Sequence, residues 1–335
     1  MSIPRVSVIV PVRDVAEYLD DALASLSRQF DDPLDLEVVL VDDGSDDGTP
    51  EIARAHAALL PGLVILENEE PVGAATARNQ GLDVVRGRYV TYLDGDDWLV
   101  PGHLEAMADA IEFFGCPVLR HDHMTVEGAT RRTVRAPEPV RDRVLDPRES
   151  ILPEDRPTMV DYPYAWAGLY DRAIAADGLL TFTDGMQTAT DRAWVWRLHL
   201  DGPQYVVVNA RGVCYRRGVT TSLTQTYDMR RLDFTKAFAE IATMLENDRE
   251  PDRFLPKLVR TVLAITAHHL GYVEHMPDAV RDELMRRSSQ LISSFPDRLV
   301  AEALVASGPE RQQVLRDVVP AGLVVERPAD RGEVR

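Results

Sequence analysis

Carboxylate side chains are concentrated in two short turns of the sequence, residues 42–45 (DDGS) and 94–97 (DGDD). Carboxylates two positions apart at the end of a strand can point into one pocket, and oxygen ligands suit hard cations such as Mg²⁺ and Mn²⁺. A cation held there would neutralise a diphosphate and assist its departure. An aspartate of the other turn would accept the N–H of a base or a ribose hydroxyl. Each turn alone is equally typical of a solvated loop, because aspartate and glycine satisfy turn geometry.

The apolar pattern around these turns predicts the elements that hold them. Runs rich in β-branched residues at 6–10, 36–41, 63–67 and 89–93 are typical of strands buried on both faces of a parallel sheet. Helical patterns lie between these runs, which predicts βαβ units. In such sheets, ligands bind beyond the carboxyl ends of the strands. Both acidic turns, and a first turn at 11–14, follow strand ends, so we expect them to converge.

Two helix starts are expected from local signals. Thr49 is expected to be the N-cap of the helix after the second strand, with Pro50 at its first position. An aspartate of the second acidic turn would cap a helix that begins near residues 98–101.

The pattern changes further along the chain. Residues 130–157 are polar and rich in proline and arginine, which predicts an irregular insertion. A helix at about 191–200 and closing strands at 205–208 and 213–215 would follow. Later helices are expected at 234–245, 254–273, 280–295 and 299–306. The sequence thus predicts an α/β domain over residues 1–226, a helical domain over 227–326 and a frayed tail over 327–335.

Charge and composition exclude several classes of protein. The 335 residues carry 37 basic and 55 acidic side chains, a formal charge of −18, which argues against binding to nucleic acid or to an anionic membrane surface. Cys116 and Cys214 lie far apart without zinc-site spacing, so neither a disulfide framework nor a structural zinc site is expected. No apolar run reaches the length of a signal sequence or a membrane span. We therefore expect a cytoplasmic protein that acts, if at a membrane, at its inner face.

The motifs, taken in order, resemble a known family. The matching segments are VSVIVPVRDVAEYLDDALASL, VVLVDDGSDDGT, PVGAATARNQGL, YVTYLDGDDW, FTDGMQTATDRAW and VCYRRGVTTSLT. Over residues 6–224 the chain resembles bacterial nucleotide-sugar glycosyltransferases of family 2, which have the GT-A fold. The resemblance implies a Rossmann-like, mostly parallel sheet flanked by helices, and it does not cover the C-terminal helices.

The resemblance implies a role for each matching residue. Asp43, with Asp42 beside it, would contact the uracil, and Asp94 would reach the ribose. Asp96 would bind the metal, Mn²⁺ or Mg²⁺, and Asp97 would support the metal or the sugar. The nucleotide pocket would further include Pro11, Val12, Asp14 and Arg78, and the diphosphate would be contacted by Arg216, Arg217 and Ser222. Arginines in an exposed loop of this arginine-rich chain explain the last group equally well.

The general base is implied at Asp191. The family places this carboxylate at the start of a helix, as the aspartate of a Glu-Asp pair, and the matching pair here is Thr190-Asp191. A threonine cannot supply the second negative charge that would raise the pKa of the base. Asp191 is also well suited to the first turn of a helix, where a negative charge is favourable, and both roles can coexist.

Aromatic and histidine residues near the base have two interpretations. Tyr162, Tyr164, Trp166 and Tyr170 would either form a wall on the acceptor side or belong to the core. The pattern 121–123 (HDH) places two imidazoles on one face of a strand, but no third ligand nearby supports a zinc site.

These residues together predict an inverting, metal-dependent hexosyl- or N-acetylhexosaminyl-transferase. Its donor would be a nucleotide-diphosphate sugar, most simply a UDP-sugar. Its acceptor would be a hydroxyl of a glycan, a cell-envelope polymer, or a lipid-linked or small-molecule precursor. Two alternatives remain, a sugar nucleotidyltransferase and a catalytically silent protein that binds nucleotide sugars or glycans. Apolar stripes of the C-terminal helices suggest a homodimer.

Overall fold

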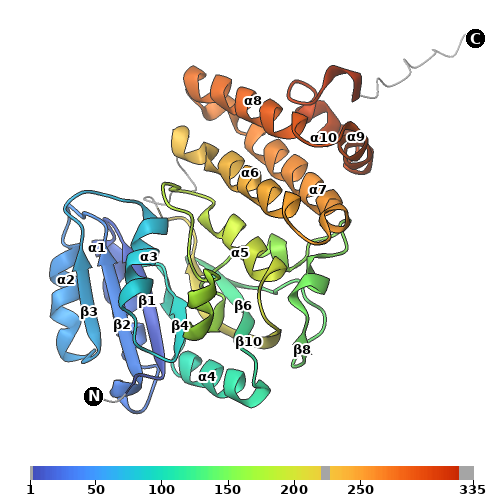
Figure 1. Cartoon of the computed structure of the whole chain (residues 1–335). Coiled ribbons are helices and arrows are strands. Elements are labelled where there is room, and N and C mark those ends of the chain that lie inside the picture. The colour runs from blue at the N-terminus through green and yellow to red at the C-terminus, as the bar shows by residue number, and fades with distance from the viewer. Residues whose placement is uncertain (1–2, 220–226, 324–335) are drawn as a thin grey trace, which may run out of the picture. The chain divides into compact units, whose positions relative to one another are not determined.

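The computed structural model describes residues 3–219 and 227–323, and Ser222 of the expected diphosphate segment lies outside them. The chain divides into two compact units, Met1–Thr226 and Tyr227–Arg335. Each unit is described by itself (Figure 1).

The first unit is built on one mixed sheet. Within the described residues it has ten strands in the order β3-β2-β1-β4-β9-β6-β10-β5, with β7 paired to β6 and β8 paired to β10. The half formed by β3, β2, β1 and β4 is parallel. The strands are β1 (Val6–Val12), β2 (Leu36–Asp42), β3 (Leu63–Glu67), β4 (Tyr89–Tyr92), β5 (Trp98–Leu99), β6 (Val118–Glu127), β7 (Thr130–Val134), β8 (Val144–Leu145), β9 (Gly168–Asp171) and β10 (Tyr205–Arg216). The expected α/β fold with a mostly parallel sheet is confirmed.

Helices cover this sheet and fix where its strands end. They are α1 (Ala16–Leu26), α2 (Thr49–Ala55), α3 (Ala74–Val84), α4 (His103–Phe114) and α5 (Thr190–Leu200). Every residue of β2 is buried, as expected of a strand covered on both faces. β1, β2 and β4 lie side by side and run in the same direction, so the turns after Val12, Asp42 and Tyr92 meet at one edge of the sheet.

Several local expectations are wrong. Gly48, not Thr49, is the N-cap of α2, because the Thr49 hydroxyl instead accepts the backbone N–H of Val15 at 3.0 Å. No helix begins at 98–101; the short strand β5 lies there and pairs with β10. The two closing strands are one strand, β10, with a register shift between Val208 and Val213. Residues 130–157 contain β7 and β8, so the insertion is not wholly irregular.

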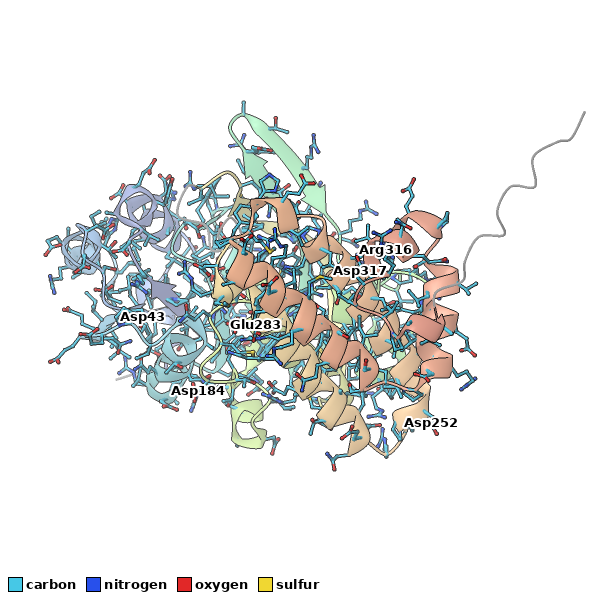
Figure 2. The ribbon with its side chains drawn as sticks, turned by 90° about the horizontal axis from the view of Figure 1, so that it is seen from above. Asp43, Asp184, Asp252, Glu283, Arg316 and Asp317 are labelled. Atoms are coloured by element: carbon cyan, nitrogen blue, oxygen red, sulfur yellow. The ribbon has the colours of Figure 1, made fainter. Side chains whose placement is uncertain are left out.

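The second unit is helical, as expected. Its helices are α6 (Asp233–Glu246), α7 (Pro251–Leu270), α8 (Asp278–Ser293), α9 (Asp297–Ala306) and α10 (Pro309–Leu315), the last of which the sequence pattern missed. The apolar stripe of α7, which includes Phe254, Leu258 and Val262, is buried, and α7 packs against α6, α8, α9 and α10. On the α8 surface, Glu283 accepts hydrogen bonds from Arg286 and Arg287 (Figure 2). Over the residues described, no helix is both long and apolar enough to cross a membrane.

Gly81 allows α3 to lie close to the sheet, which gives a first prediction. A Cβ at this position would lie 2.5 Å from Cγ2 of Ile9 in β1. Helix propensity alone would make Gly81→Ala stabilising by roughly 1 kcal/mol. The β-branched Ile9 is stiff and buried, so we expect overpacking to outweigh this gain and lower the free energy of unfolding by about 1–3 kcal/mol.

Urea unfolding of both variants measures this effect. Gly322→Ala is the control, because nothing lies within 4 Å of the place that its Cβ would take. Equal stability of the Gly81→Ala variant and the unmodified chain would refute the close approach of α3 to β1.

Candidate active site

One guanidinium joins the parts of the site that are far apart in sequence. Arg78, on α3, donates from Nη2 to Oδ1 of Asp94 at 2.7 Å and from Nη1 to Oδ1 of Asp191 at 3.2 Å. Nη1 also donates to the Thr190 hydroxyl at 3.1 Å. The candidate ribose ligand and the candidate base are thereby held by the same side chain.

Arg78 is buried, which makes these partners necessary. Its exposed fraction is 6%, and its guanidinium carbon lies 5.1 Å from the centre of the Phe182 ring. Burial alone would lower the pKa of Arg78, but the charges of Asp94 and Asp191 raise it above its usual value. A buried charge persists only when it is paired and hydrogen-bonded, as it is here.

The carboxylate of Asp191 has a fixed orientation. Oδ2 accepts the backbone N–H of Ala165 at 2.8 Å, and Oδ1 accepts the Thr190 hydroxyl at 3.1 Å. Asp191 lies in the first turn of α5, where the helix dipole favours a negative charge. Where the resemblance implies a glutamate, Thr190 therefore supplies a hydrogen bond to the base instead of a second charge.

The turn 94–97 gathers carboxylates that repel one another. Burial and then the charge of Asp94 raise the pKa of Asp96 to about 6. Burial, Asp96 and Asp94 raise the pKa of Asp97 well above its usual value. Oδ1 of Asp97 accepts the backbone N–H of Arg216 at 2.7 Å, while its buried Oδ2 has no partner within the described residues. The repulsion among these carboxylates and the Asp97 Oδ2 without a partner in the described residues both favour a bound cation at this turn.

The carboxylates of this turn suit Mg²⁺ or Mn²⁺ but do not enclose it. Across residues 3–219 and 227–323, no group of three or more histidine, cysteine, aspartate or glutamate side chains has an arrangement that could hold a metal ion. Mg²⁺ commonly takes only one or two carboxylates and completes its shell with water and phosphate oxygens. Such a cation would be held by Asp96 together with oxygens from a ligand.

Arg216 is tied to the same turn. Its Nε donates to the carbonyl oxygen of Asp96 at 2.8 Å, and its Nη2 donates to Oδ2 of Asp21 at 2.9 Å. The guanidinium carbon lies 4.6 Å from the centre of the Trp98 ring. Arg217 is exposed, and its Nη1 donates to the Tyr215 hydroxyl at 3.3 Å.

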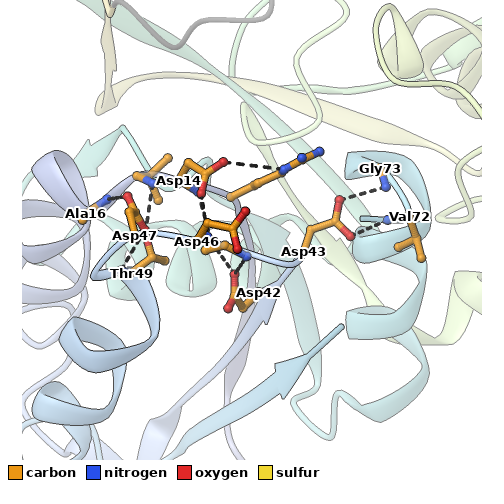
Figure 3. Close-up of polar contacts among 12 residues, drawn as sticks. Asp14, Ala16, Asp42, Asp43, Asp46, Asp47, Thr49, Val72 and Gly73 are labelled. Carbon is orange, nitrogen blue, oxygen red and sulfur yellow. Dashed lines mark hydrogen bonds and ion pairs between the residues drawn. The ribbon is translucent and has the colours of Figure 1, made fainter. Parts of the chain in front are cut away.

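The other acidic turn uses its carboxylates to hold backbone (Figure 3). Asp43 accepts the N–H groups of Val72 at 2.7 Å and Gly73 at 2.8 Å, immediately before α3 begins. A third donor is the Asn68 amide, at 3.1 Å. A carboxylate offers about four acceptor positions, so the side chain that the resemblance assigns to uracil keeps about one for a ligand.

Asp42 and Asp14 also shape their turns. Oδ1 of Asp42 accepts both the backbone N–H and the hydroxyl of Ser45. Asp14 has a left-handed φ of 52°, and its Oδ1 accepts the N–H of Asp46 at 2.9 Å. Pro11 and Val12 end β1, where a Cβ on Gly95 would lie 2.7 Å from Val12 Cγ1. The turns 11–14, 42–45 and 94–97 therefore converge, as expected from the strand ends.

The sequence pattern did not predict the hydrogen bonds that join residues 182–184 to α3. Asn79 donates to the Phe182 carbonyl at 2.9 Å and accepts the Phe182 N–H at 2.8 Å. Thr76 and Asn79 both donate to Oδ1 of Asp184. These contacts bring the segment before α5 to the helix that carries Arg78. The segment ARN contained a signal for them, because an asparagine beside a buried arginine offers both a donor and an acceptor.

Three of the four aromatic residues near Asp191 are buried. Tyr162, Trp166 and Tyr170 are buried and belong to the core, whereas Tyr164 is half-buried. Trp166 lies 4.8 Å from Tyr164 and 5.5 Å from Tyr215, measured between ring centres. These rings adjoin Ala165, whose N–H holds Asp191.

The histidines of β6 are buried among neighbouring rings. The His121 ring lies edge-on to His103, with 4.7 Å between centres, and His123 is hydrogen-bonded to the Tyr162 hydroxyl. Burial lowers the pKa of His121 to about 4 and that of His123 to about 3, so both are neutral near pH 7. Their contacts are those of core residues.

Comparison with known proteins agrees with this fold. The chain resembles the glycosyltransferase AglE of Haloferax volcanii, at 35% identity over 34% of the chain and 39% of the relative. It also resembles EpsJ of Bacillus subtilis, named an uncharacterized glycosyltransferase, at 30% identity over 56% of the chain and 54% of the relative. The chain thus spans about half the length, or less, of these curated relatives.

The fold is similar to that of TarS residues 1–349 from S. aureus, crystallised with UDP-GlcNAc. The TM-score is 0.72 at 19% identity, over 94% of this chain and 88% of that one. Residues 7–171 match the model described as glycosyl transferase family 2. With the sheet, the converging turns and these relatives, this match identifies residues 7–171 as a glycosyl transferase family 2 domain.

Proposed function

We propose that the protein transfers a sugar from a nucleotide-diphosphate sugar, a UDP-sugar, to an acceptor hydroxyl. The observation that carries the proposal is the bridge from Asp94 through Arg78 to Asp191, because one guanidinium contacts both the acid expected on the donor side and the expected base. TarS, a structural neighbour of the chain, was crystallised with UDP-GlcNAc and with UDP, which supports a uridine donor.

In the proposed reaction, Asp191 takes the proton of the acceptor hydroxyl. The acceptor oxygen forms a bond to the anomeric carbon as the bond from that carbon to the diphosphate oxygen breaks. UDP departs with the bonding electrons, and the anomeric centre inverts in one displacement. The bonds from Ala165 and Thr190 hold the carboxylate of Asp191 in one orientation, which is what a general base requires.

Asp96, with Asp97 beside it, would hold Mn²⁺ or Mg²⁺. When bound, the cation would stabilise the negative charge that develops on the leaving diphosphate. The unpartnered Oδ2 of Asp97 and the raised pKa of Asp96 support a cation at this turn. A more distant structural neighbour, PcManGT from Pyrobaculum calidifontis, was solved with GDP-Man and Mn²⁺.

Asp191→Asn tests the role of the base. An amide cannot accept the proton, so we expect transfer to fall by about a hundredfold or more while the affinity for UDP changes little. The measurements are transfer from UDP-sugars to an acceptor panel and titration of UDP. Asp201→Asn, an exposed acid at the other end of α5, is the control. Unchanged turnover by the Asp191 variant would exclude the proposed base.

The unmodified chain distinguishes the two alternative functions. A chain that binds UDP-sugar but turns over none would be the silent binding protein, and pyrophosphate release from UTP would indicate a nucleotidyltransferase.

Metal removal tests the role of Asp96. We expect UDP to raise the thermal midpoint in the presence of Mn²⁺ and to have little effect in EDTA, since a bound ligand at a hundred times its Kd adds roughly 2.7 kcal/mol. Asp96→Asn should abolish the Mn²⁺-dependent part of the shift. Asp83→Asn, exposed on α3, should retain it. An equal shift by UDP with EDTA would argue against a metal-dependent site.

Arg78→Lys tests the bridge. Lysine keeps the charge, but its single ammonium cannot reproduce a planar fork that reaches two carboxylates and a hydroxyl. We expect kcat to fall at least about tenfold. Arg54→Lys changes an exposed ion pair with Glu67 and serves as the control. Full activity of the Arg78 variant would mean that the bridge does not position the base.

Light scattering tests the expected homodimer. The α7 stripe already packs within its own unit, so a dimer would need another surface. A single mass equal to that of one chain would exclude it.

A further inference from the structure

The steps proposed above do not use a small basic cavity beside the turn 94–97, although two of its lining residues, Arg216 and Arg217, are those that the resemblance assigns to the diphosphate. The volume of the cavity is about 290 Å³, and its lining includes Tyr18, Trp98, Val126, Arg131, Arg216 and Arg217. No aspartate or glutamate is among its lining residues. The cavity adjoins the donor side, because Arg216 bonds to the Asp96 carbonyl and Trp98 follows Asp97.

The sheet register brings two of these arginines to one face. Arg131 on β7 pairs with Val126 on β6, and Val126 pairs with Arg216 on β10. Paired residues on neighbouring strands project to the same side, and strands lie about 4.8 Å apart. The Cα atoms of Arg131 and Arg216 are therefore about 10 Å apart. This spacing leaves room for one small anion between the two side chains.

The charge of the cavity contrasts with that of the chain. The whole sequence carries −18, yet the cavity gathers three guanidinium groups. Arg216 is paired with Asp21. Arg131 and Arg217 form no ion pair with an acidic side chain within the described parts of the chain. Two uncompensated cations in a hollow surface concentrate anions.

The third guanidinium is already in place before any ligand arrives. The guanidinium carbon of Arg216 lies 5.0 Å from the centre of the Tyr18 ring and 4.6 Å from that of the Trp98 ring. Two of its five N–H groups are engaged by Asp21 and the Asp96 carbonyl. A fixed guanidinium binds a tetrahedral oxyanion with little loss of side-chain entropy. The other three N–H groups of its guanidinium form no hydrogen bond within the described residues.

We propose that this cavity binds a phosphate group of the acceptor, so that the acceptor is a phosphate-bearing glycan or polyol. The inference rests on the proposed function and adds the acceptor class. Phosphate suits three arginines better than a carboxylate does, because it has more oxygens to share among them. Arg131 also comes from the β6–β7 hairpin rather than from the turns that form the donor side.

The test uses the full chain and a short synthetic glycerol-phosphate oligomer, compared with an uncharged oligosaccharide of similar length. Calorimetric titration is done with Mn²⁺ and saturating UDP. We expect binding of the oligomer only, weakened about tenfold by Arg131→Gln. Arg132→Gln removes the same charge from the next residue of β7, whose side chain faces the opposite side of the sheet, and should change the affinity less than twofold.

Each other outcome overturns the inference. Equal loss in the Arg131 and Arg132 variants would indicate diffuse attraction to the hairpin. Binding of the oligomer only when UDP is left out, with UDP binding weakened by Arg131→Gln, would assign the cavity to the donor diphosphate. Binding to phosphatidylglycerol vesicles but not to the oligomer would assign it to a membrane surface. Failure of UDP itself to bind would instead refute the proposed function, so the two failures are distinguishable.

Discussion

The active site depends on burying one positive charge between two negative ones. Arg78 is almost inaccessible to water, and its charge is sustained by Asp94 on one side and Asp191 on the other. Removing one partner of a buried pair typically costs about 3–5 kcal/mol, because the other charge is left uncompensated. The end of β4, the helix α3 and the start of α5 are therefore tied to one position.

Aspartates in and just after the first acidic turn hold the backbone at the starts of neighbouring helices, including the helix that carries Arg78. Asp43 holds the backbone of Val72 and Gly73, which lead into α3, so it fixes the start of the helix that carries Arg78. Asp47 holds the N–H groups of Ala16 and Thr49, and these bonds lower its pKa although burial opposes its charge. Carboxylates near strand ends thus set the positions of α1, α2 and α3. A turn rich in acids can be both scaffold and ligand surface.

Much of this fold was predictable because its signals are local. The runs at 36–41 and 63–67 became β2 and β3 with little change, since a buried parallel strand is written in consecutive residues. Thr49 was misassigned as a cap because its competing partner, Val15, is 34 residues away. The bridge of Arg78 joins residues 16 and 113 positions apart, and only the resemblance placed that arginine near the nucleotide. The cavity lined by Arg131 depends on strand register, which the sequence pattern did not reveal.

The order in which the bridge becomes complete has a consequence for synthesis of the chain. A ribosome makes Arg78 and Asp94 close together, but Asp191 emerges about a hundred residues later, at 5–20 residues per second. During those seconds, α3 carries a guanidinium with only half of its compensation, and the surface that α5 will cover is still open. Asp191 then supplies the second negative charge that the buried Arg78 contacts in the folded chain. A nascent chain that has not reached α5 therefore has the residues of the parallel half of the sheet but lacks both Asp191 and β10.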